Sequence, residues 1–351
     1  MRSYVCFYTI LIFFFITTVS CKRSDRDSSR ITIIEGKIKP SFLKKHIIYF
    51  YRYTDSLGLY FCEKTLTDSC ELKPDGSFKF EIKNWNQSGF FDLGTNEMVF
   101  ARNYFLQPAD HLNLIFDGNE LPGTLNLSAR IGKYNLFLQT FSDTFYRSMH
   151  IKETYYKTSN YMLAPDYSVY INNRRNEQIA FYKNYFKEEE IDSVFNFYFE
   201  NETDYNWAND KLYFLWKKRM RKEVVPVDSN YFDFLKIVKV DNAPALICPG
   251  YTRFINLYIR ELLDEKTPTA AQNFNPSIER FNLAKSKLKG AGLRIAFLNF
   301  LRDEINSVDA IEGNTLHEAV LKEMLTIAYT STNDSSFYYF ARSNGKTISG
   351  K

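Results

Sequence analysis

Cysteine is the residue type whose positions in this chain most directly suggest chemistry. There are five cysteines, and Cys21 stands where a long apolar run gives way to a polar segment. The run extends from Val5 to Val19 behind a single charge, Arg2. As a helix rising about 1.5 Å per residue it would span roughly 22 Å, short of the ~30 Å hydrocarbon core of a bilayer. This length is typical of a secretory signal rather than a permanent membrane span.

The end of this run gives Cys21 an assigned chemical role. Thr18-Val19-Ser20-Cys21 resembles a bacterial lipobox, in which a small residue precedes the cysteine that receives the lipid, although Thr18 stands where Leu is usual. We expect residues 1–21 to be a lipoprotein signal peptide that ends at the lipidated Cys21, and the polar residues 22–30 to be a flexible tether. A plain cleaved signal and an uncleaved N-terminal anchor are the alternatives.

The lipid would make the bilayer a partner and place the protein in the cell envelope as a lipid-anchored membrane protein. Acidic residues directly after the lipidated cysteine favour surface export, and Lys22-Arg23 does not resemble that signal. We therefore expect the protein to face the periplasm, with the outer membrane favoured over the inner.

Two further cysteines, Cys62 and Cys70, are the candidate disulfide pair, because an oxidising envelope permits one. If the chain turned at Leu66, the two would lie opposite each other. If residues 59–72 formed one strand, they would lie about 26 Å apart. Thr65-Leu66-Thr67 contains none of the usual turn residues, which favours the single strand. Cys248, within Ala-Leu-Ile-Cys-Pro-Gly, fits a small buried hydrophobe.

The sequence carries no recognisable catalytic or metal-binding motif. It contains no Cys-x-x-Cys, Gly-x-Ser-x-Gly, P-loop or dinucleotide fingerprint. The four histidines, His46, His111, His150 and His317, are scattered. We therefore assign no catalytic residue, metal ligand or cofactor. A hydrolase whose carboxylates converge only in the fold stays open as an alternative.

Charge and composition narrow the function classes further. The net charge is +4, and no dense Lys/Arg tract with interleaved aromatic residues is present, so together with the secreted address we expect no nucleic-acid partner. At 45% hydrophobic and 25% charged residues the chain is globular. Its 32 Phe and 25 Tyr fit a sugar-stacking surface or, as we favour, a compositional bias.

Hydrophobic periodicity predicts an α+β fold with two domains. Residues 31–122 contain seven or so short β-branched or alternating segments separated by turns such as Pro74-Asp75-Gly76, which predicts an antiparallel β-sandwich-like domain. Residues 125–335 carry helical stripes, and they predict an α-helical domain that includes one long helix over residues 177–199 and another over residues 231–238. Residues 336–351 are expected to be a C-terminal tail.

The order of these parts resembles a known family. The stretches that carry the resemblance are residues 68–80, Phe105-Leu106-Gln107-Pro108-Ala109-Asp110, residues 228–235, residues 251–258 and residues 284–290. They are similar to the N-terminal part of TlpA-like thiol–disulfide oxidoreductase lipoproteins of Bacteroidota, which usually have Pro-Gly-Asp where this chain has Pro-Ala-Asp. In that family a lipobox is followed by a β-rich domain of unknown function, a helical region and a thioredoxin-like domain.

The resemblance implies an N-terminal part without the redox domain. Residues 344–349 resemble the opening hairpin of a thioredoxin-like domain, but the sequence contains no redox cysteine pair after them. The leading hypothesis is therefore a non-catalytic binding or interaction module. The alternative is an accessory half or remnant of an oxidoreductase that works with a separate thioredoxin-fold protein of the envelope.

Overall fold

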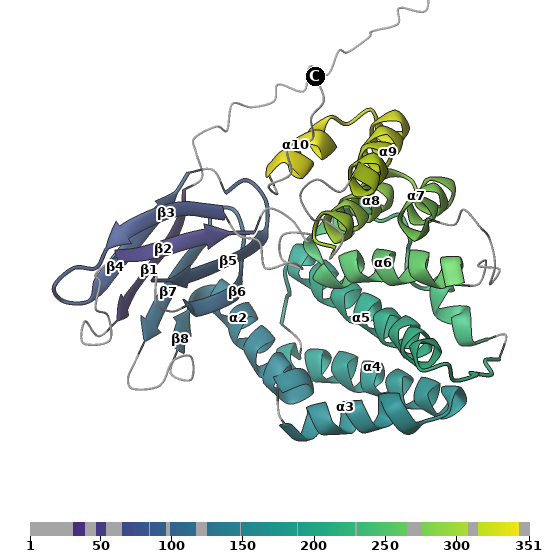
Figure 1. Ribbon diagram of the computed structural model, residues 1–351. Coiled ribbons are helices and arrows are strands. Elements are labelled where there is room, and N and C mark those ends of the chain that lie inside the picture. Colours follow the sequence, from purple (N-terminus) through teal and green to yellow (C-terminus); the bar gives the residue numbers. More distant parts are fainter. Residues whose placement is uncertain are drawn as a thin grey trace, which may run out of the picture.

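The structure is a computed structural model that describes residues 31–38, 47–53, 65–83, 85–95, 99–116, 125–147, 149–187, 189–228, 230–264, 275–307 and 315–343. Its β-domain and helical domain confirm the predicted α+β class (Figure 1). The signal peptide, the tether, Cys21 and Cys62 lie outside the described residues and stay predictions. None of the described helices has an apolar stretch long enough to cross a membrane.

Two four-stranded sheets make up the described β-domain. One has the strand order β4-β1-β7-β8 and the other β3-β2-β5-β6. All pairs among these strands are antiparallel except β1 with β7. The strands are β1 (Thr32–Ile38), β2 (Ile47–Arg52), β3 (Thr65–Glu71), β4 (Ser77–Ile82), β5 (Gly89–Gly94), β6 (Val99–Leu106), β7 (His111–Phe116) and β8 (Leu125–Ser128).

Alternating side chains explain how the two sheets pack. In β4, Phe78, Phe80 and Ile82 are buried while Lys79 and Glu81 are exposed, as the period of two predicts. Phe80 packs on Phe50 of the other sheet with ring centroids 5.9 Å apart. The turn before β4 is also as predicted, since Gly76 has φ 83° and Asp75 Oδ1 accepts a hydrogen bond from the Ser77 backbone N–H at 3.0 Å.

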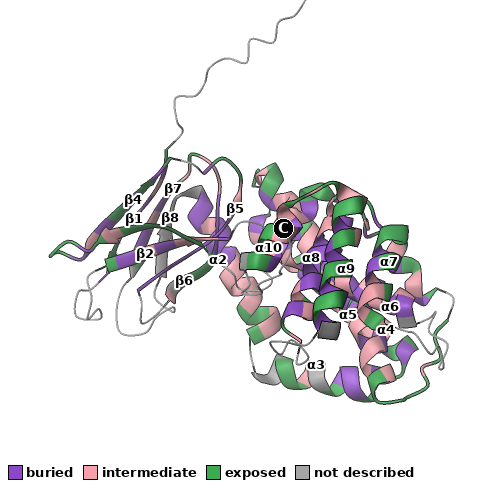
Figure 2. Ribbon diagram, turned by 45° about the horizontal axis from the view of Figure 1, so that its top comes forward, coloured by how far each residue is buried: buried purple, intermediate pink, exposed green. Residues whose placement is uncertain are grey.

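The helical domain follows directly and covers one end of the β-domain (Figures 1 and 2). Its elements are α2 (Ala129–Ser142), the π-helix η2 (Asp143–Arg147), α3 (Met149–Tyr161), α4 (Ala164–Phe186), α5 (Ser193–Met220), the short 3-10 helices η3 (Tyr231–Lys236) and η4 (Ala243–Ile247), α6 (Pro249–Asp264), α7 (Pro276–Lys287), α8 (Gly290–Ile305), α9 (Thr315–Thr332) and α10 (Ser336–Ser343).

The single helix predicted over residues 177–199 is wrong. The helix α4 ends at Phe186, and α5 begins at Ser193. Lys187 has φ 48°, which ends α4, and Asp192 Oδ1 accepts hydrogen bonds from the backbone N–H groups of Val194 and Phe195. An aspartate that caps these first orphan donors starts a new helix.

Three other boundaries differ from the prediction. Leu125–Ser128 forms β8 against β7, so the helical domain begins at Ala129. Ser336–Ser343 is the helix α10, not part of a tail, because the fully buried Phe337 anchors it on Phe297 of α8. The segment expected to be helical over residues 231–238 is a 3-10 helix over Tyr231–Lys236.

Aromatic rings join the two domains. Phe90 of β5 packs on Tyr198 of α5 with centroids 5.0 Å apart, and Phe105 of β6 packs on Phe195 at 5.4 Å. Within the helical domain, Tyr134 of α2 stacks on the same Phe195 at 4.1 Å with an interplanar angle of 7°. These rings belong to one continuous hydrophobic core, so the two domains pack firmly on each other.

Candidate ligand-binding cleft between the two domains

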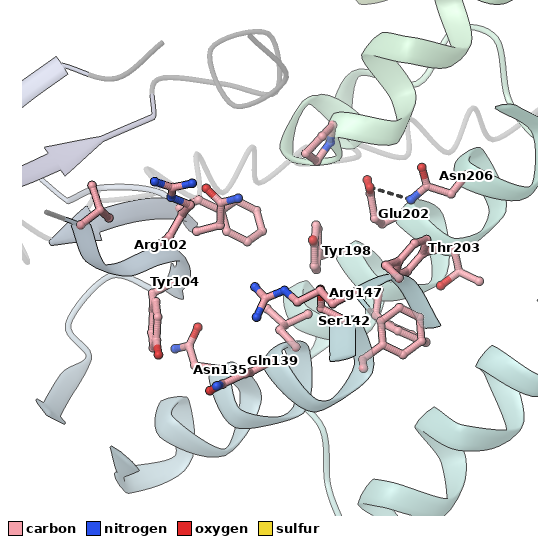
Figure 3. Close-up of a pocket in the computed structure, with 18 residues that line it drawn as sticks. Arg102, Tyr104, Asn135, Gln139, Ser142, Arg147, Tyr198, Glu202, Thr203 and Asn206 are labelled. Atoms are coloured by element: carbon pink, nitrogen blue, oxygen red, sulfur yellow. Dashed lines mark hydrogen bonds between the residues drawn. The ribbon is translucent and has the colours of Figure 1, made fainter. Parts of the chain in front are cut away.

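A cavity of about 730 Å³ lies where β5 and β6 meet α2, η2 and α5 (Figure 3). This size suits a small organic ligand. The residues that line it come from both domains: Phe90, Val99, Arg102, Asn103 and Tyr104 from the strands, Asn135, Leu138, Gln139, Phe141, Ser142, Tyr146 and Arg147 from α2 and η2, and Tyr198, Phe199, Glu202, Thr203, Asn206 and Pro249.

A β-bulge builds the strand wall of the cleft. The register between β5 and β6 shifts between Phe91 and Leu93, and Asn103 has φ 56°. Asp92, only 1% exposed, holds this backbone by accepting a hydrogen bond from the Asn103 backbone N–H at 2.8 Å. Such bulges re-aim neighbouring side chains. Here Arg102 and Asn103 are exposed at the cleft.

The helix α2 is attached to the strand wall by one buried side chain. Asn135 Oδ1 accepts a hydrogen bond from the Phe105 backbone N–H at 2.6 Å, and Asn135 Nδ2 donates to the Phe105 carbonyl oxygen at 2.8 Å. Phe105 belongs to β6, which is an edge strand. The amide therefore takes the place of a neighbouring strand and fixes the distance between α2 and the sheet.

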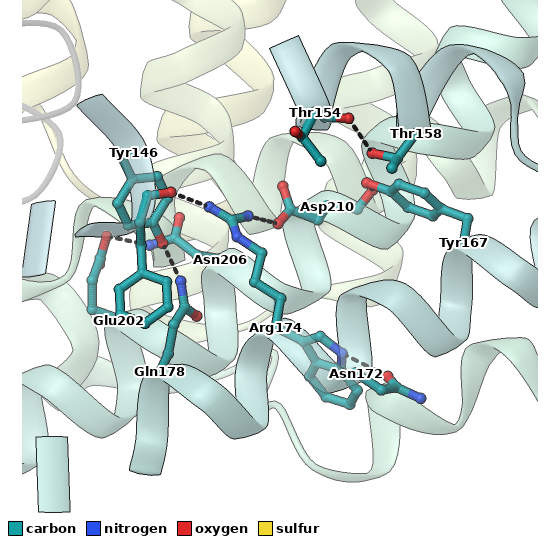
Figure 4. Close-up of polar contacts among 12 residues, drawn as sticks. Tyr146, Thr154, Thr158, Tyr167, Asn172, Arg174, Gln178, Glu202, Asn206 and Asp210 are labelled. Carbon is teal, nitrogen blue, oxygen red and sulfur yellow. Dashed lines mark hydrogen bonds and ion pairs between the residues drawn. The ribbon is translucent and has the colours of Figure 1, made fainter. Parts of the chain in front are cut away.

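The π-helix η2 forms the third wall, and Arg174 of α4 holds it in place (Figure 4). Arg174 Nη2 donates to the Phe145 carbonyl oxygen at 2.9 Å, and its guanidinium lies 4.8 Å from the centre of the Tyr146 ring. The Tyr146 hydroxyl accepts a hydrogen bond from Gln178 Nε2 at 3.1 Å. These contacts keep Tyr146 and Arg147 at the cleft. π-helical turns recur at functional sites.

The wall from α5 supplies one carboxylate, Glu202. Its Oε2 accepts a hydrogen bond from the Gly250 backbone N–H at 2.9 Å, and its Oε1 accepts one from Asn206 Nδ2 at 2.8 Å (Figure 3). Burial raises the pKa of Glu202, while both hydrogen bonds oppose the rise. Glu202 thus satisfies an orphan amide at the start of α6, which is a structural role in itself.

Two arginines give the cleft its charge, since Arg102 and Arg147 stand among its described lining residues with Glu202 as the carboxylate. Burial raises the pKa of Tyr104 and that of Tyr146 to about 12, so both keep their hydroxyl protons at neutral pH. The positive charge of Arg147 opposes the rise in the pKa of Tyr104. Guanidinium groups, phenols and aromatic faces together suit an anionic ligand with a ring or apolar surface.

A second cavity, of about 860 Å³, lies on another side of the same junction and contains two acids, Asp110 and Asp192. Asp110 Oδ2 accepts a hydrogen bond from the Gln107 backbone N–H at 2.7 Å, and Asp192 caps α5. Gln107 Nε2 also donates to Asp192 Oδ1 at 2.8 Å. Both carboxylates thus hold a turn or a helix start, so the cavity offers the hydrolase alternative no direct support.

The structure describes two of the cysteines, Cys70 and Cys248. Leu66 lies inside β3 and pairs with Tyr51, so the turn that would set Cys62 opposite Cys70 is not formed at that residue. Cys70 is half-buried, and burial raises the pKa of its thiol to about 11. Because Cys62 lies outside the described residues, the pairing of the two cysteines stays a prediction. Cys248 is fully buried, as predicted.

The histidines are not brought together where the structure describes them. His111 is exposed and lies 2.8 Å from Glu35, and His317 is buried with Nδ1 3.0 Å from Glu304. Within the described residues no cluster of His, Cys, Asp or Glu could hold a metal ion.

None of the cleft residues was found from the sequence. Arg102 and Arg147 lie far apart in the chain, and only the packing of α2 on β6 brings them to one cavity. The sequence offers only a weak signal for the cleft. The bulge depends on Asp92 and Asn103, and an Asp and an Asn eleven residues apart form no recognisable motif. No family model, no curated protein and no solved structure matches this chain.

Proposed function

We propose that this chain is a membrane-anchored lipoprotein of the cell envelope that acts as a non-catalytic binding module, and that the interdomain cleft holds its ligand. The role would be related to that of the N-terminal part of thiol–disulfide oxidoreductases, and a thioredoxin-fold envelope protein is the proposed protein partner. The observation that supports ligand binding is the pair Arg102 and Arg147 in an aromatic cleft of about 730 Å³, while the envelope address rests on the predicted lipobox.

The ligand class follows from the walls. Arginine recognises carboxylate, phosphate or sulfonate oxygens through charge-assisted hydrogen bonds. The aromatic side chains of Phe90, Tyr146 and Tyr198 line the cleft beside these charges and supply apolar surface. A small anionic molecule with a ring or hydrocarbon part therefore matches the cleft best.

Anilinonaphthalene sulfonate has this chemistry and serves as the probe. Titration of the purified protein, followed by fluorescence, should show saturable binding to one strong site. The double variant Arg102→Gln and Arg147→Gln should bind the dye at least about tenfold more weakly, because each charge-assisted hydrogen bond contributes about 1.5–3 kcal/mol. Circular dichroism should be unchanged, since both arginines are exposed.

Arg342→Gln is the matched control, because Arg342 is also exposed but lies on α10 outside the cleft. Its dye affinity should equal that of the unaltered protein. Equal affinity of the double variant would refute the cleft as the binding site. Mass spectrometry of small molecules released from protein purified out of its own envelope would then identify the natural ligand.

A further inference from the structure

One corner of the helical domain exposes large apolar side chains beside a basic segment. The end of α3, the start of α4 and the end of α5 meet there, at the end of the helical domain that lies away from the strands (Figure 1). Lys218 Nζ donates to the Asn160 carbonyl oxygen at 2.8 Å, and Arg221 Nη2 donates to Asn160 Oδ1 at 2.5 Å. These bonds tie α5 to α3, so the side chains on both belong to one surface.

Four apolar side chains project from this corner. Tyr161 is 78% exposed, Leu163 68%, Met220 67% and Val224 95%. Single exposed apolar residues need no explanation, but four at one junction of helix ends do. Val224 lies in the stretch after α5, where residues 223–228 are exposed except for Val225. Burial of these side chains in an apolar phase would therefore be favourable.

Positive charge surrounds the same side chains. Residues 217–222 include five Lys or Arg, and Glu223 is the acid that follows them. Three of the five are paired with acids: Lys218 with Glu223 at 2.7 Å, Arg219 with Glu261 at 2.5 Å and Arg221 with Glu223 at 3.9 Å. Arg221 and Lys222 are exposed. Arg221 and Lys218 also help to lower the pKa of Lys217, after burial, which reflects their mutual repulsion.

We propose that this corner, formed by Tyr161, Leu163, Met220 and Val224 with the exposed Arg221 and Lys222, docks on the surface of a bilayer that contains anionic lipids. Two contributions hold proteins on such surfaces. Apolar side chains enter the headgroup region, and cations beside them face the anionic headgroups. Binding to a protein would need a partner surface whose shape matches this corner. Insertion into a bilayer needs only an apolar layer that can accept the Tyr, Leu, Met and Val side chains.

The corner would act together with the proposed lipid anchor. Residues 22–30 precede the first described residue and can reach about 30 Å when extended. An anchor at the N-terminal side and a contact at the far end of the helical domain would lay the long direction of the molecule along the membrane. Docking depends on the proposed function only because the protein must be in the cell envelope to reach a bilayer. The two proposals can therefore be tested separately.

The test uses the chain from Lys22 onward, which keeps all described elements and has neither leader nor lipid. It is sedimented with phosphatidylcholine vesicles that contain or lack phosphatidylglycerol. The protein should sediment with the anionic vesicles and be released by added salt. The double variant Met220→Asp and Val224→Asp should bind at least about tenfold more weakly, since it adds repulsion and removes apolar contact. Both positions are exposed, so folding should be kept.

Tyr339→Asp is the matched control, because Tyr339 is 69% exposed on α10, away from the corner. It should bind vesicles as the unaltered chain does. Failure of the unaltered chain to bind anionic vesicles would overturn the proposal, and this includes the case in which the corner binds a protein instead. Equal binding by the double variant would overturn it as well. Neither result would bear on lipidation of Cys21 or on dye binding in the cleft.

Discussion

Arg174 and Asp210 form a largely buried ion pair between α4 and α5, with Nη1 3.1 Å from Oδ2, and the same guanidinium holds the π-helix through the Phe145 carbonyl oxygen (Figure 4). The two side chains are only 12% and 14% exposed. One residue thus couples the packing of two helices to the shape of the cleft wall that presents Tyr146 and Arg147.

Replacement of Arg174 by Lys should weaken dye binding in the cleft as well as stability. Lysine keeps the charge but lacks the planar fork that reaches Asp210 and Phe145 together. We expect a loss of about 1–3 kcal/mol in the free energy of unfolding, measured with urea, and a severalfold loss of dye affinity. Arg175→Lys is the control. Arg175 pairs with Asp204 and stacks on Trp207, so its loss should lower stability and leave dye affinity unchanged.

Asn135→Ala should destabilise the protein by about 2–4 kcal/mol, because it leaves the Phe105 backbone N–H and carbonyl buried without their partner. Urea unfolding followed by circular dichroism measures the change. Thr140→Ala on the same helix provides the comparison: Thr140 is half-buried and its hydroxyl donates to the Leu136 carbonyl within α2, so we expect a change within about 0.5 kcal/mol. Equal effects of the two substitutions would show that Asn135 does not clamp the domains.

Lys211 should make stability rise with pH. It is buried, its Nζ lies 2.6 Å from Ser168 Oγ, and burial lowers its pKa to about 8. Below pH 8 both the folded and the unfolded chain carry the proton, and the folded state bears the full desolvation cost. As pH rises from about 8 toward 10.4, the unfolded state binds more protons than the folded one, so the free energy of unfolding increases.

Lys211→Met should therefore stabilise the protein at pH 7 by about 1–3 kcal/mol, and this gain should shrink between pH 8 and 10. Tyrosines titrate in the same pH range in both proteins, so subtracting the two free energies of unfolding removes their contribution. Lys79→Met, a change at an exposed pair with Glu81, is the control and should show no such trend. A gain that stayed constant with pH would contradict the assignment.

Cys21 should carry the membrane anchor. Metabolic labelling with a fatty acid should tag the protein, and Cys21→Ala should remove the tag and release the protein from membranes, because stable attachment depends on the acyl chains. Cys70→Ala is the control and should stay labelled, since Cys70 lies in a strand of the β-domain. A Cys21→Ala protein that is still processed and still membrane-bound would exclude the lipobox.

The strands could be predicted because their signal is local. Phe78, Phe80 and Ile82 alternate with charged residues, and this pattern alone identifies β4 and its buried face. The break between α4 and α5 was missed for a related reason. Tyr182 and Phe186 follow helical spacing, and the apolar Ile191 comes soon after them, so the pattern runs across a boundary that only the cap at Asp192 reveals.

The cleft could not be predicted, because its geometry depends on contacts between distant residues. Arg102 is aimed by a bulge that needs Asp92 on the neighbouring strand. Arg147 is placed by a π-helix that needs Arg174 on another helix. Neither arrangement produces a recognisable spacing of residues in the sequence, because the residues that form the bulge and the π-helix are also common in ordinary strands and helices.

The Asn135 clamp has a consequence beyond the joining of two domains. An edge strand offers unpaired amides and carbonyls to any other extended chain, and this is how sheets grow into aggregates. On the β3-β2-β5-β6 sheet, the amide of Asn135 already occupies Phe105 in the last strand. Loss of this side chain would leave the Phe105 amide and carbonyl open to an extended chain, so Asn135→Ala should self-associate more readily than the unaltered protein.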